Sequence, residues 1–258
     1  MDRPDAPWTL GESDFDLDAV REMRRGQSIG VVIPAQNEAT TIGAVIDAVT
    51  HHQGFVDEVL VVNDHSSDDT HVVARHHGAR VHDLQGPSGK GEALAAGLAA
   101  LTSDFVVFLD ADVLNPGMDY VARMVQPLLA RPEIHFVKGY YQRPLHDMPT
   151  GGGRVNELAA RPILSLLYPG LGEMRQPLAG ETAARRETLE SLTLESAYGV
   201  EIAMMIDVAL KFGVSSLAQV DLGVRRHRNR PLEELRPMAV EVLRAALTRF
   251  NVEMPDDD

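Results

Sequence analysis

The alternation of short apolar runs with segments of helical periodicity constrains the fold of this chain more than any other feature. Apolar or β-branched runs end near Ile33, Val62, Val81 and Leu109, and helical segments separate them. Strands that alternate with helices predict an α/β fold, with a mostly parallel sheet and helices on both faces. A length of 258 residues suits one large domain, or one domain with an appendage.

Polar residues follow three of these runs directly, at Asn37-Glu38, at 63–66 and at 110–112. In parallel sheets ligands bind at the carboxyl ends of the strands, whereas randomly placed polar loops would fall at both ends. We therefore expect a ligand site at this edge. Asn37, Glu38 and Asp64 are candidate acceptors for a sugar hydroxyl or a base N–H, with helix capping as the alternative.

Two carboxylates, Asp110 and Asp112, end the fourth run two positions apart. In extended chain such side chains point to the same side. Hard oxygen ligands at a strand end suit a divalent cation whose other positions are filled by phosphate and water. The alternative is a polar strand end that only turns the chain.

A glycine-rich loop at 86–91 contains Lys90 at the start of a helical segment. Glycines allow close backbone approach, so the loop favours phosphate binding. Its spacing differs from that of a Walker A motif, and an ordinary turn is the alternative.

Cationic residues gather in two later segments. Four arginines and His227 occupy 225–230, which suggests an anion clamp and one metal ligand; a solvated loop is the alternative. Arg154 follows three glycines, which suggests an anion site at a helix start, or else a linker. Glu201 lies in an apolar helical segment and is either a surface residue or a buried acceptor for a substrate hydroxyl.

Composition narrows the class of protein. The formal net charge of −14 argues against general nucleic-acid binding. No run of 18 apolar residues is present, and residues 1–25 lack the apolar region of a signal peptide, so we expect no membrane span and no signal peptide. The absence of cysteine excludes disulfides and fits a cytoplasmic protein.

The segments 32–38, 63–70 and 110–112 resemble those of GT-A glycosyltransferases that use nucleotide sugars. Further segments narrow the resemblance to the retaining glucosyl-3-phosphoglycerate synthases and the related mannosyl-3-phosphoglycerate synthases. These segments, which occur in the family's order, are 89–94, 151–155, 176–181, 198–202 and 227–232. The resemblance extends from about Trp8 to Phe250 and implies a Rossmann-like GT-A fold with a smaller acceptor-binding C-terminal half.

The resemblance also implies roles for matching residues. The residues implied for the nucleotide sugar are Pro34, Ala35, Asn37, Glu38, Asp64, Ser66, Gly89, Lys90, Asp110, Ala111, Asp112, Gly180, Glu201 and Arg225. Those implied for the acceptor are Gly153, Arg154, Asn156, Tyr198, Arg228 and Asn229. Asp112 and His227 would bind Mg or Mn, and with Lys90 and Glu201 they form the implied catalytic set.

The implied reaction is metal-dependent, retaining transfer of a hexose from a nucleotide-diphosphate sugar, such as UDP-glucose or a GDP-sugar, to a small anionic acceptor, most simply 3-phosphoglycerate. Two departures leave room for a different acceptor in specialised metabolism: Asn156 stands where the family has threonine, and the connector before Gly151 is short. A non-catalytic nucleotide-sugar binding protein is a second alternative. A nucleotidyltransferase would need its Gly/Lys loop directly after the first strand, where 34–38 lies instead.

The resemblance further implies a homodimer and a division of the chain. The expected parts are an N-terminal arm (1–27), a nucleotide-sugar-binding half (28–145), an acceptor-binding half (146–231), and a C-terminal helix with an acidic tail (232–258).

Overall fold

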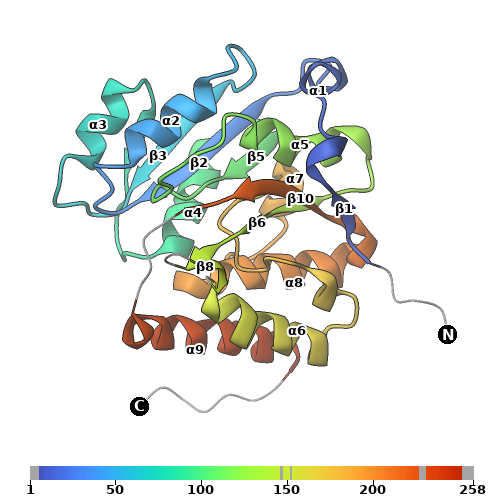
Figure 1. The fold of residues 1–258 in the computed structure, drawn as a ribbon. Helices are drawn as coiled ribbons and strands as arrows, with labels where there is room; N and C mark the ends of the chain where they lie inside the picture. Colours follow the sequence, from blue (N-terminus) through green and yellow to red (C-terminus); the bar gives the residue numbers. More distant parts are fainter. Residues whose placement is uncertain (1–5, 146–147, 152, 227–230, 252–258) are drawn as a thin grey trace.

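A computed structural model describes residues 6–145, 148–151, 153–226 and 231–251. One sheet in the strand order β1-β10-β6-β9-β5-β2-β3-β4 forms its centre (Figure 1). Neighbouring strands are parallel except where β9 lies antiparallel between β5 and β6. The strands are β1 (Trp8–Leu10), β2 (Ile29–Ala35), β3 (Glu58–Asn63), β4 (Arg80–Asp83), β5 (Phe105–Phe108), β6 (Phe136–Gln142), β9 (Thr182–Arg185) and β10 (Leu217–Val224). β7 (Pro144–Leu145) and β8 (Met148–Gly151) form a separate antiparallel pair.

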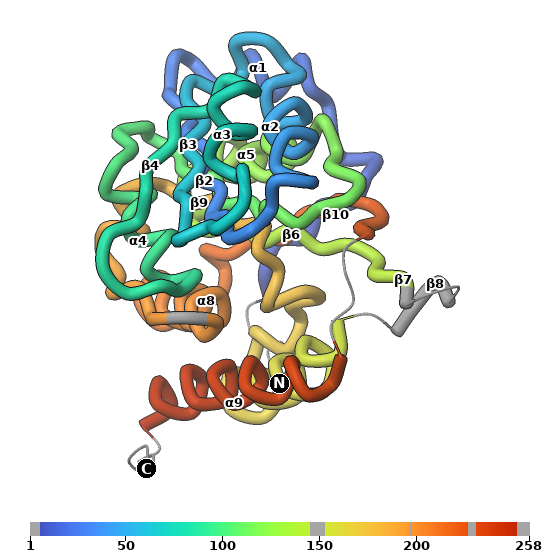
Figure 2. Tube along the Cα trace, turned by 90° about the vertical axis from the view of Figure 1, so that its left-hand side faces the viewer, coloured from blue at the N-terminus to red at the C-terminus, as the bar shows by residue number. Residues whose placement is uncertain are grey.

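Helices cover both faces of the sheet. The helices on one face are α1 (Leu17–Met23), α2 (Ile42–Thr50), α3 (Thr70–His76) and α5 (Tyr120–Ala130). Those on the other are α4 (Lys90–Ala100), α6 (Arg161–Leu167), α7 (Arg186–Glu190), α8 (Val200–Phe212) and α9 (Leu232–Arg249). α9 packs on α8 and lies farther from the sheet than α8 does (Figure 1, Figure 2). No helix in the described ranges combines the length and the apolar character that crossing a bilayer requires.

Short turns of other helix types complete the chain. They are the 3₁₀ turns η1 (Glu12–Asp14), η3 (Leu171–Glu173), η4 (Ala197–Gly199) and η5 (Val214–Ser216), and the π-helical turn η2 (Asn156–Ala160). η2 runs directly into α6, and π-helical turns occur frequently at functional sites.

The central strands bury both faces. In β2, Val31 and Ile33 belong to the core under α2 and α5, while Val32 belongs to the core under α4 and α8. Strands buried on both sides read as continuous apolar runs, which is why the sequence predicts this sheet correctly. The predicted α/β fold with helices on both faces is confirmed.

Two strands of the main sheet lie where the sequence does not predict them. β9 has the sequence Thr-Ala-Ala-Arg, which is too short and too weakly patterned to indicate a strand. β1 lies within the predicted arm 1–27 and pairs with β10 at the sheet edge. Since β6, β9 and β10 extend the same sheet, the two predicted halves of the chain share one framework; their boundaries stay a prediction.

The carboxyl ends of β2, β3 and β5 meet at one edge, as the sequence predicts. Asn37 follows β2 with φ of 57°, and His65 follows β3 with φ of 53°. Non-glycine residues seldom adopt this left-handed conformation, and such residues cluster at functional sites. Both strands therefore end in sharp loops at the edge where a ligand is expected.

Candidate active site

A cavity of about 490 Å³ opens at this edge of the sheet. Its two ends are built differently. The sheet end comprises residues from the loops after β2, β3 and β5 and from the start of α4, while the helix end comprises 153–156, Leu178, Tyr198 and one side of α9. The sequence-predicted residues that line the cavity are Pro34, Ala35, Glu38, Asp64, Gly89, Lys90, Asp110, Ala111, Asp112, Gly153, Arg154, Asn156, Tyr198 and Glu201.

Asp64 lies buried at the sheet end and is held by the glycine-rich loop. Its Oδ2 accepts hydrogen bonds from the Ser88 hydroxyl at 2.9 Å and the Gly89 N–H at 3.1 Å. The Gln36 amide donates to the Asp64 carbonyl at 3.0 Å. Within the described residues Asp64 Oδ1 has no hydrogen-bond partner, so a buried acceptor remains for a ligand N–H.

Asn37 and Ser66 are absent from the cavity lining and tie the two strand-end loops together. The Asn37 N–H donates to Ser66 Oγ at 3.0 Å, and the Asn37 side chain accepts from the Ser67 N–H at 2.8 Å. The contacts that the structure gives both residues are thus those of loop-fixing residues, and a nucleotide-binding role for either stays a prediction.

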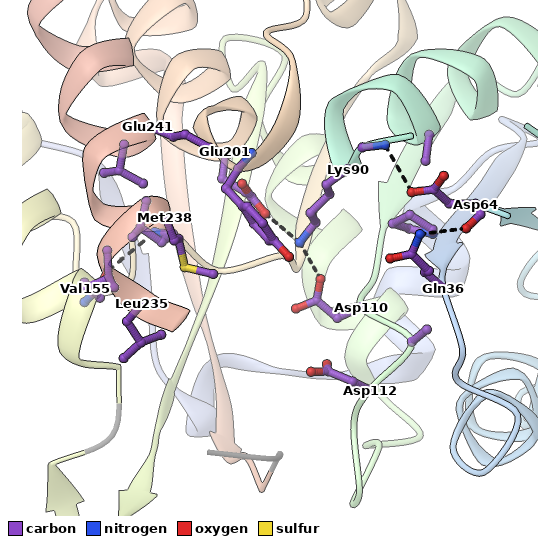
Figure 3. Close-up of a pocket in the computed structure, with 18 of the residues that line it drawn as sticks. Gln36, Asp64, Lys90, Asp110, Asp112, Val155, Glu201, Leu235, Met238 and Glu241 are labelled. Atoms are coloured by element: carbon purple, nitrogen blue, oxygen red, sulfur yellow. Dashed lines mark hydrogen bonds and ion pairs between the residues drawn. The ribbon is translucent and has the colours of Figure 1, made fainter. Parts of the chain in front are cut away.

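Lys90 joins the two ends of the cavity (Figure 3). As the first residue of α4, it places Nζ 2.6 Å from Asp110 Oδ1 and 2.5 Å from Glu201 Oε1 on α8. Burial disfavours the ammonium, but the two carboxylates outweigh it and raise the pKa of Lys90 well above its ordinary value. Lys90 is therefore a fixed positive charge in the wall of the cavity.

Asp110 is held between two cations. Besides Lys90, Arg225 Nη2 donates to its Oδ2 at 2.9 Å. Burial works to raise the pKa of Asp110, yet Lys90 and Arg225 hold it well below its ordinary value, so the carboxylate stays ionised. A Cβ on Gly180 would lie 2.0 Å from Asp110 Oδ1, so only glycine permits this approach of the 176–181 loop. Gly180 and Arg225 thus hold Asp110 from outside the cavity lining.

A buried lysine on the neighbouring strand β6 also holds the 176–181 loop. Lys138 on β6 is 1% exposed, and its Nζ donates to the Ala179 carbonyl and, at 3.0 Å, to Thr182 Oγ1. Burial lowers the pKa of Lys138 to about 8. The sequence predicts the strand that contains Lys138 but no site role for this lysine.

Asp112 opens onto the cavity with its side chain 36% exposed, and its Oδ1 accepts from Arg225 Nη2 at 3.3 Å. A hard, ionisable oxygen donor at a cavity wall fits a divalent cation. The described residues contain no group of three His, Asp or Glu side chains that would enclose a metal on their own. His227, Arg228 and Asn229, which the sequence assigns to the metal and the acceptor, lie outside the described residues.

The helix end gathers the remaining predicted residues. Gly153 adopts a left-handed φ of 71° just before Arg154, which lines the cavity. Asn156 is 2% exposed; its Nδ2 donates to the Arg175 carbonyl at 3.2 Å and its Oδ1 accepts from the Leu178 N–H at 3.4 Å. Asn156 therefore holds the 175–178 segment in addition to lining the cavity.

One wall of the cavity is not predicted from the sequence. The lining residues outside the prediction are Gln36, Ser88, Ala93, Arg143, Val155, Leu178, Leu235, Met238, Glu241 and Val242. Four of these belong to α9, whose apolar positions resemble those of any amphipathic helix. The Tyr198 N–H donates to Glu241 Oε2 at 2.9 Å and links α9 to the start of α8.

Comparison with known proteins identifies the family. Residues 30–159 match the family described as Glycosyl transferase family 2. A glucosyl-3-phosphoglycerate synthase from Mycobacterium tuberculosis is 45% identical over 260 residues, which cover 95% of this chain and 78% of the relative.

Solved structures of glucosyl-3-phosphoglycerate synthase from the same organism share the fold. The complex with Mn²⁺ and UDP-glucose has a TM-score of 0.88 at 42% identity and covers 97% of this chain and 88% of that chain. The complex with Mn²⁺, UDP-glucose and phosphoglyceric acid has a TM-score of 0.87 at 42% identity and covers 98% of this chain and 89% of that chain. The chain is therefore a glycosyltransferase that belongs to family 2 and, within it, to the family of glucosyl-3-phosphoglycerate synthases.

Proposed function

We propose that this enzyme transfers glucose from UDP-glucose to 3-phosphoglycerate with retention of anomeric configuration and with Mn²⁺ or Mg²⁺. The observation that carries the proposal is that one cavity joins a charged sheet end to a helix end containing Arg154, with Lys90 and Glu201 between them. The similar enzyme crystallised with Mn²⁺, UDP-glucose and phosphoglyceric acid supports both substrates.

The donor base fits the sheet end. Asp64 Oδ1 is a buried acceptor without a hydrogen-bond partner among the described residues, and uracil offers one N–H to such an atom. Guanine offers more than one donor, so Asp64 alone favours uracil only weakly; the UDP-glucose complex of the relative supplies the rest of the argument.

The metal fits Asp112, with His227 as the second ligand that the family resemblance implies. When bound, the cation supplies Lewis-acid stabilisation of the charge that grows on the leaving diphosphate. Lys90 adds a second positive charge that is already oriented in the cavity wall and needs no rearrangement during the reaction. Asp112, by holding the cation, and Lys90, by its own charge, would both stabilise the diphosphate.

Glu201 suits the hydroxyls of the donor glucose. It is 5% exposed, lines the cavity, and pairs with Lys90 through Oε1. A buried carboxylate that accepts sugar hydroxyls fixes the anomeric carbon in a reactive orientation.

The acceptor fits the helix end. Arg154 and the Gly153 N–H region offer donors to a phosphate or carboxylate, and Tyr198 closes the wall. The resemblance adds Arg228 and Asn229, which lie outside the described residues.

The roles of three carboxylates favour attack from the leaving-group side. Asp110 is held by Lys90 and Arg225, Glu201 pairs with Lys90 and is assigned to the sugar hydroxyls, and Asp112 is assigned to the metal, so none of these three is assigned as a nucleophile. The acceptor hydroxyl oxygen then bonds to the anomeric carbon, the bond from that carbon to the diphosphate oxygen breaks, and the hydroxyl proton passes to the diphosphate. The products are UDP and glucosyl-3-phosphoglycerate with unchanged configuration.

NMR of the reaction tests this proposal. UDP-glucose, 3-phosphoglycerate and Mn²⁺ are expected to give UDP and a product whose anomeric proton shows the small coupling of an α-glucoside, and chelation of the metal is expected to stop the reaction. GDP-glucose and GDP-mannose serve as competing donors. A β-linked product, or turnover that persists in chelator, would contradict the proposal.

Asn156 favours one alternative, the same donor chemistry on another small anionic acceptor. Its amide is occupied by Arg175 and Leu178, so an acceptor phosphate must displace a contact or bind elsewhere. Parallel reactions with 2-phosphoglycerate and glycerate decide this, because the true acceptor gives the highest kcat/KM.

Size-exclusion chromatography with light scattering tests the proposed homodimer.

A further inference from the structure

A carboxylate behind the cavity has no role in the mechanism above. Glu181 is the last residue of the 176–181 loop, directly before β9; it is 0% exposed and is absent from the main cavity's lining. Its backbone carbonyl accepts from the Gly139 N–H at 2.9 Å, which ties it to β6. Its side chain therefore occupies a fixed position in the protein interior.

The partner of Glu181 is the guanidinium of Arg225, which is 2% exposed. Arg225 Nη1 donates to Glu181 Oε1 and to the Tyr141 hydroxyl, while Nη2 donates to Asp110 at 2.9 Å and to Asp112 at 3.3 Å. Because a guanidinium is planar and rigid, whatever holds Nη1 also sets the position of Nη2.

Arg225 thus divides one positive charge among three carboxylates. Glu181 draws it toward the interior, and the two aspartates draw it toward the cavity. The contact with Asp112 is the longest of the three, and Asp112 is the most exposed of these carboxylates. If Glu181 lost its charge, Arg225 would bind the aspartates more strongly and would compete with a cation for Asp112.

We propose that Glu181 is a positioning residue that holds Arg225 back from Asp112 and so keeps an Asp112 oxygen available to the divalent cation. The inference rests on the proposed function, because it requires the metal at Asp112. Glu181 touches neither substrate nor metal in this scheme and acts only through Arg225.

The test is Glu181→Gln, which keeps the shape of the side chain and removes its charge. Free Mn²⁺ is measured by electron paramagnetic resonance during titration of the folded protein in the presence of UDP. We expect Mn²⁺ affinity to fall by about tenfold, the order produced by deleting one nearby charge in a partly screened interior. Excess Mn²⁺ is expected to restore kcat to within about twofold of wild type, because the catalytic groups remain.

Asp57→Asn is the matched control. Asp57 pairs with Arg24 and accepts from the Ile29 N–H at the amino end of β2, at the edge opposite the cavity. This variant is expected to lower the melting temperature as a lost ion pair does, with Mn²⁺ affinity unchanged. Glu181→Asp, which keeps the charge but shortens the reach to Arg225, replaces Glu181→Gln if the latter does not fold, and is expected to weaken Mn²⁺ binding by about threefold.

Unchanged Mn²⁺ affinity in the folded Glu181 variant would overturn the inference, as would a loss of kcat that excess Mn²⁺ does not restore. The wild-type titration separates this from the proposed function. If wild type binds no Mn²⁺ with UDP, the proposed function fails; if wild type binds it and the Glu181 variant binds it equally, only the inference fails.

Discussion

The sheet end and the helix end of the cavity differ in how their side chains are held. At the sheet end, Asp110 is fixed by Lys90, by Arg225 and by the close approach of Gly180. At the helix end, half-buried apolar residues of α9, such as Leu235 and Met238, share the wall with Arg154. We therefore expect donor chemistry to depend on the sheet edge, and acceptor choice to depend on the helices that meet across the cavity.

The largest expected effect comes from a substitution at the sheet end of the cavity. Lys90→Ala removes the fixed positive charge beside the proposed diphosphate position, leaves Glu201 without this partner, and leaves Asp110 with Arg225 alone. We expect kcat/KM for UDP-glucose to fall by about 10³-fold, as loss of a strong electrostatic contact does. Steady-state kinetics check this, with Lys211→Ala on α8 as the control that is expected to stay within about twofold of wild type. A loss below tenfold would show that Lys90 only holds the fold.

The second effect is on the pH dependence of the free energy of unfolding, through the buried Lys138. The pKa of Lys138 is about 8 in the folded protein, whereas its ordinary value is 10.5. Between pH 8 and 10.5 the unfolded chain therefore binds more protons than the folded protein does. The free energy of unfolding of the wild type therefore rises with pH in this range. Measured relative to Lys138→Met, this rise is expected to reach roughly 3 kcal/mol between pH 8 and 10.5.

Urea denaturation of both proteins at several pH values measures this difference. Parallel pH dependences for wild type and Lys138→Met would mean that the buried lysine does not titrate in this window.

The third effect isolates the helix end. Arg154→Gln removes a charged donor to the acceptor's phosphate or carboxylate, and the KM for 3-phosphoglycerate is expected to rise about 30-fold, as loss of a charge-assisted hydrogen bond does. The KM for UDP-glucose is expected to stay within about twofold. Equal increases in both constants would contradict the division of the cavity into two ends.

The smallest expected effect concerns which acceptor the enzyme uses. Asn156→Thr introduces the residue of the resembled family while keeping one polar group for Leu178 or Arg175. We expect the kcat/KM for 3-phosphoglycerate to change by no more than about threefold, because Asn156 chiefly holds backbone groups. A tenfold gain would identify Asn156 as a residue that selects a different acceptor.

The sequence predicts the sheet end better than the helix end for a physical reason. Strands such as β2 are buried on both faces, so their apolar runs and the polar residues that follow them are visible in the chain itself. Asp110 and Asp112 are predicted for this reason, Lys90 is predicted from the glycine-rich loop at 86–91, and all three line the cavity.

The rest depends on tertiary contacts that leave no local pattern. Met238 lines the cavity only because α9 packs on α8, and its spacing is that of any amphipathic helix. Glu181 and Lys138 are charged residues in apolar surroundings, where sequence alone does not reveal partners such as Arg225 and the Ala179 carbonyl.

The most direct test of the account is calorimetric titration of UDP-glucose into wild type and Asp112→Ala, each with and without Mn²⁺. Mn²⁺ is expected to tighten donor binding to wild type by at least about tenfold, because the cation would stabilise the bound diphosphate, and to have no effect on Asp112→Ala. Equal tightening by Mn²⁺ in both proteins would place the cation elsewhere and contradict the assignment of the metal to Asp112.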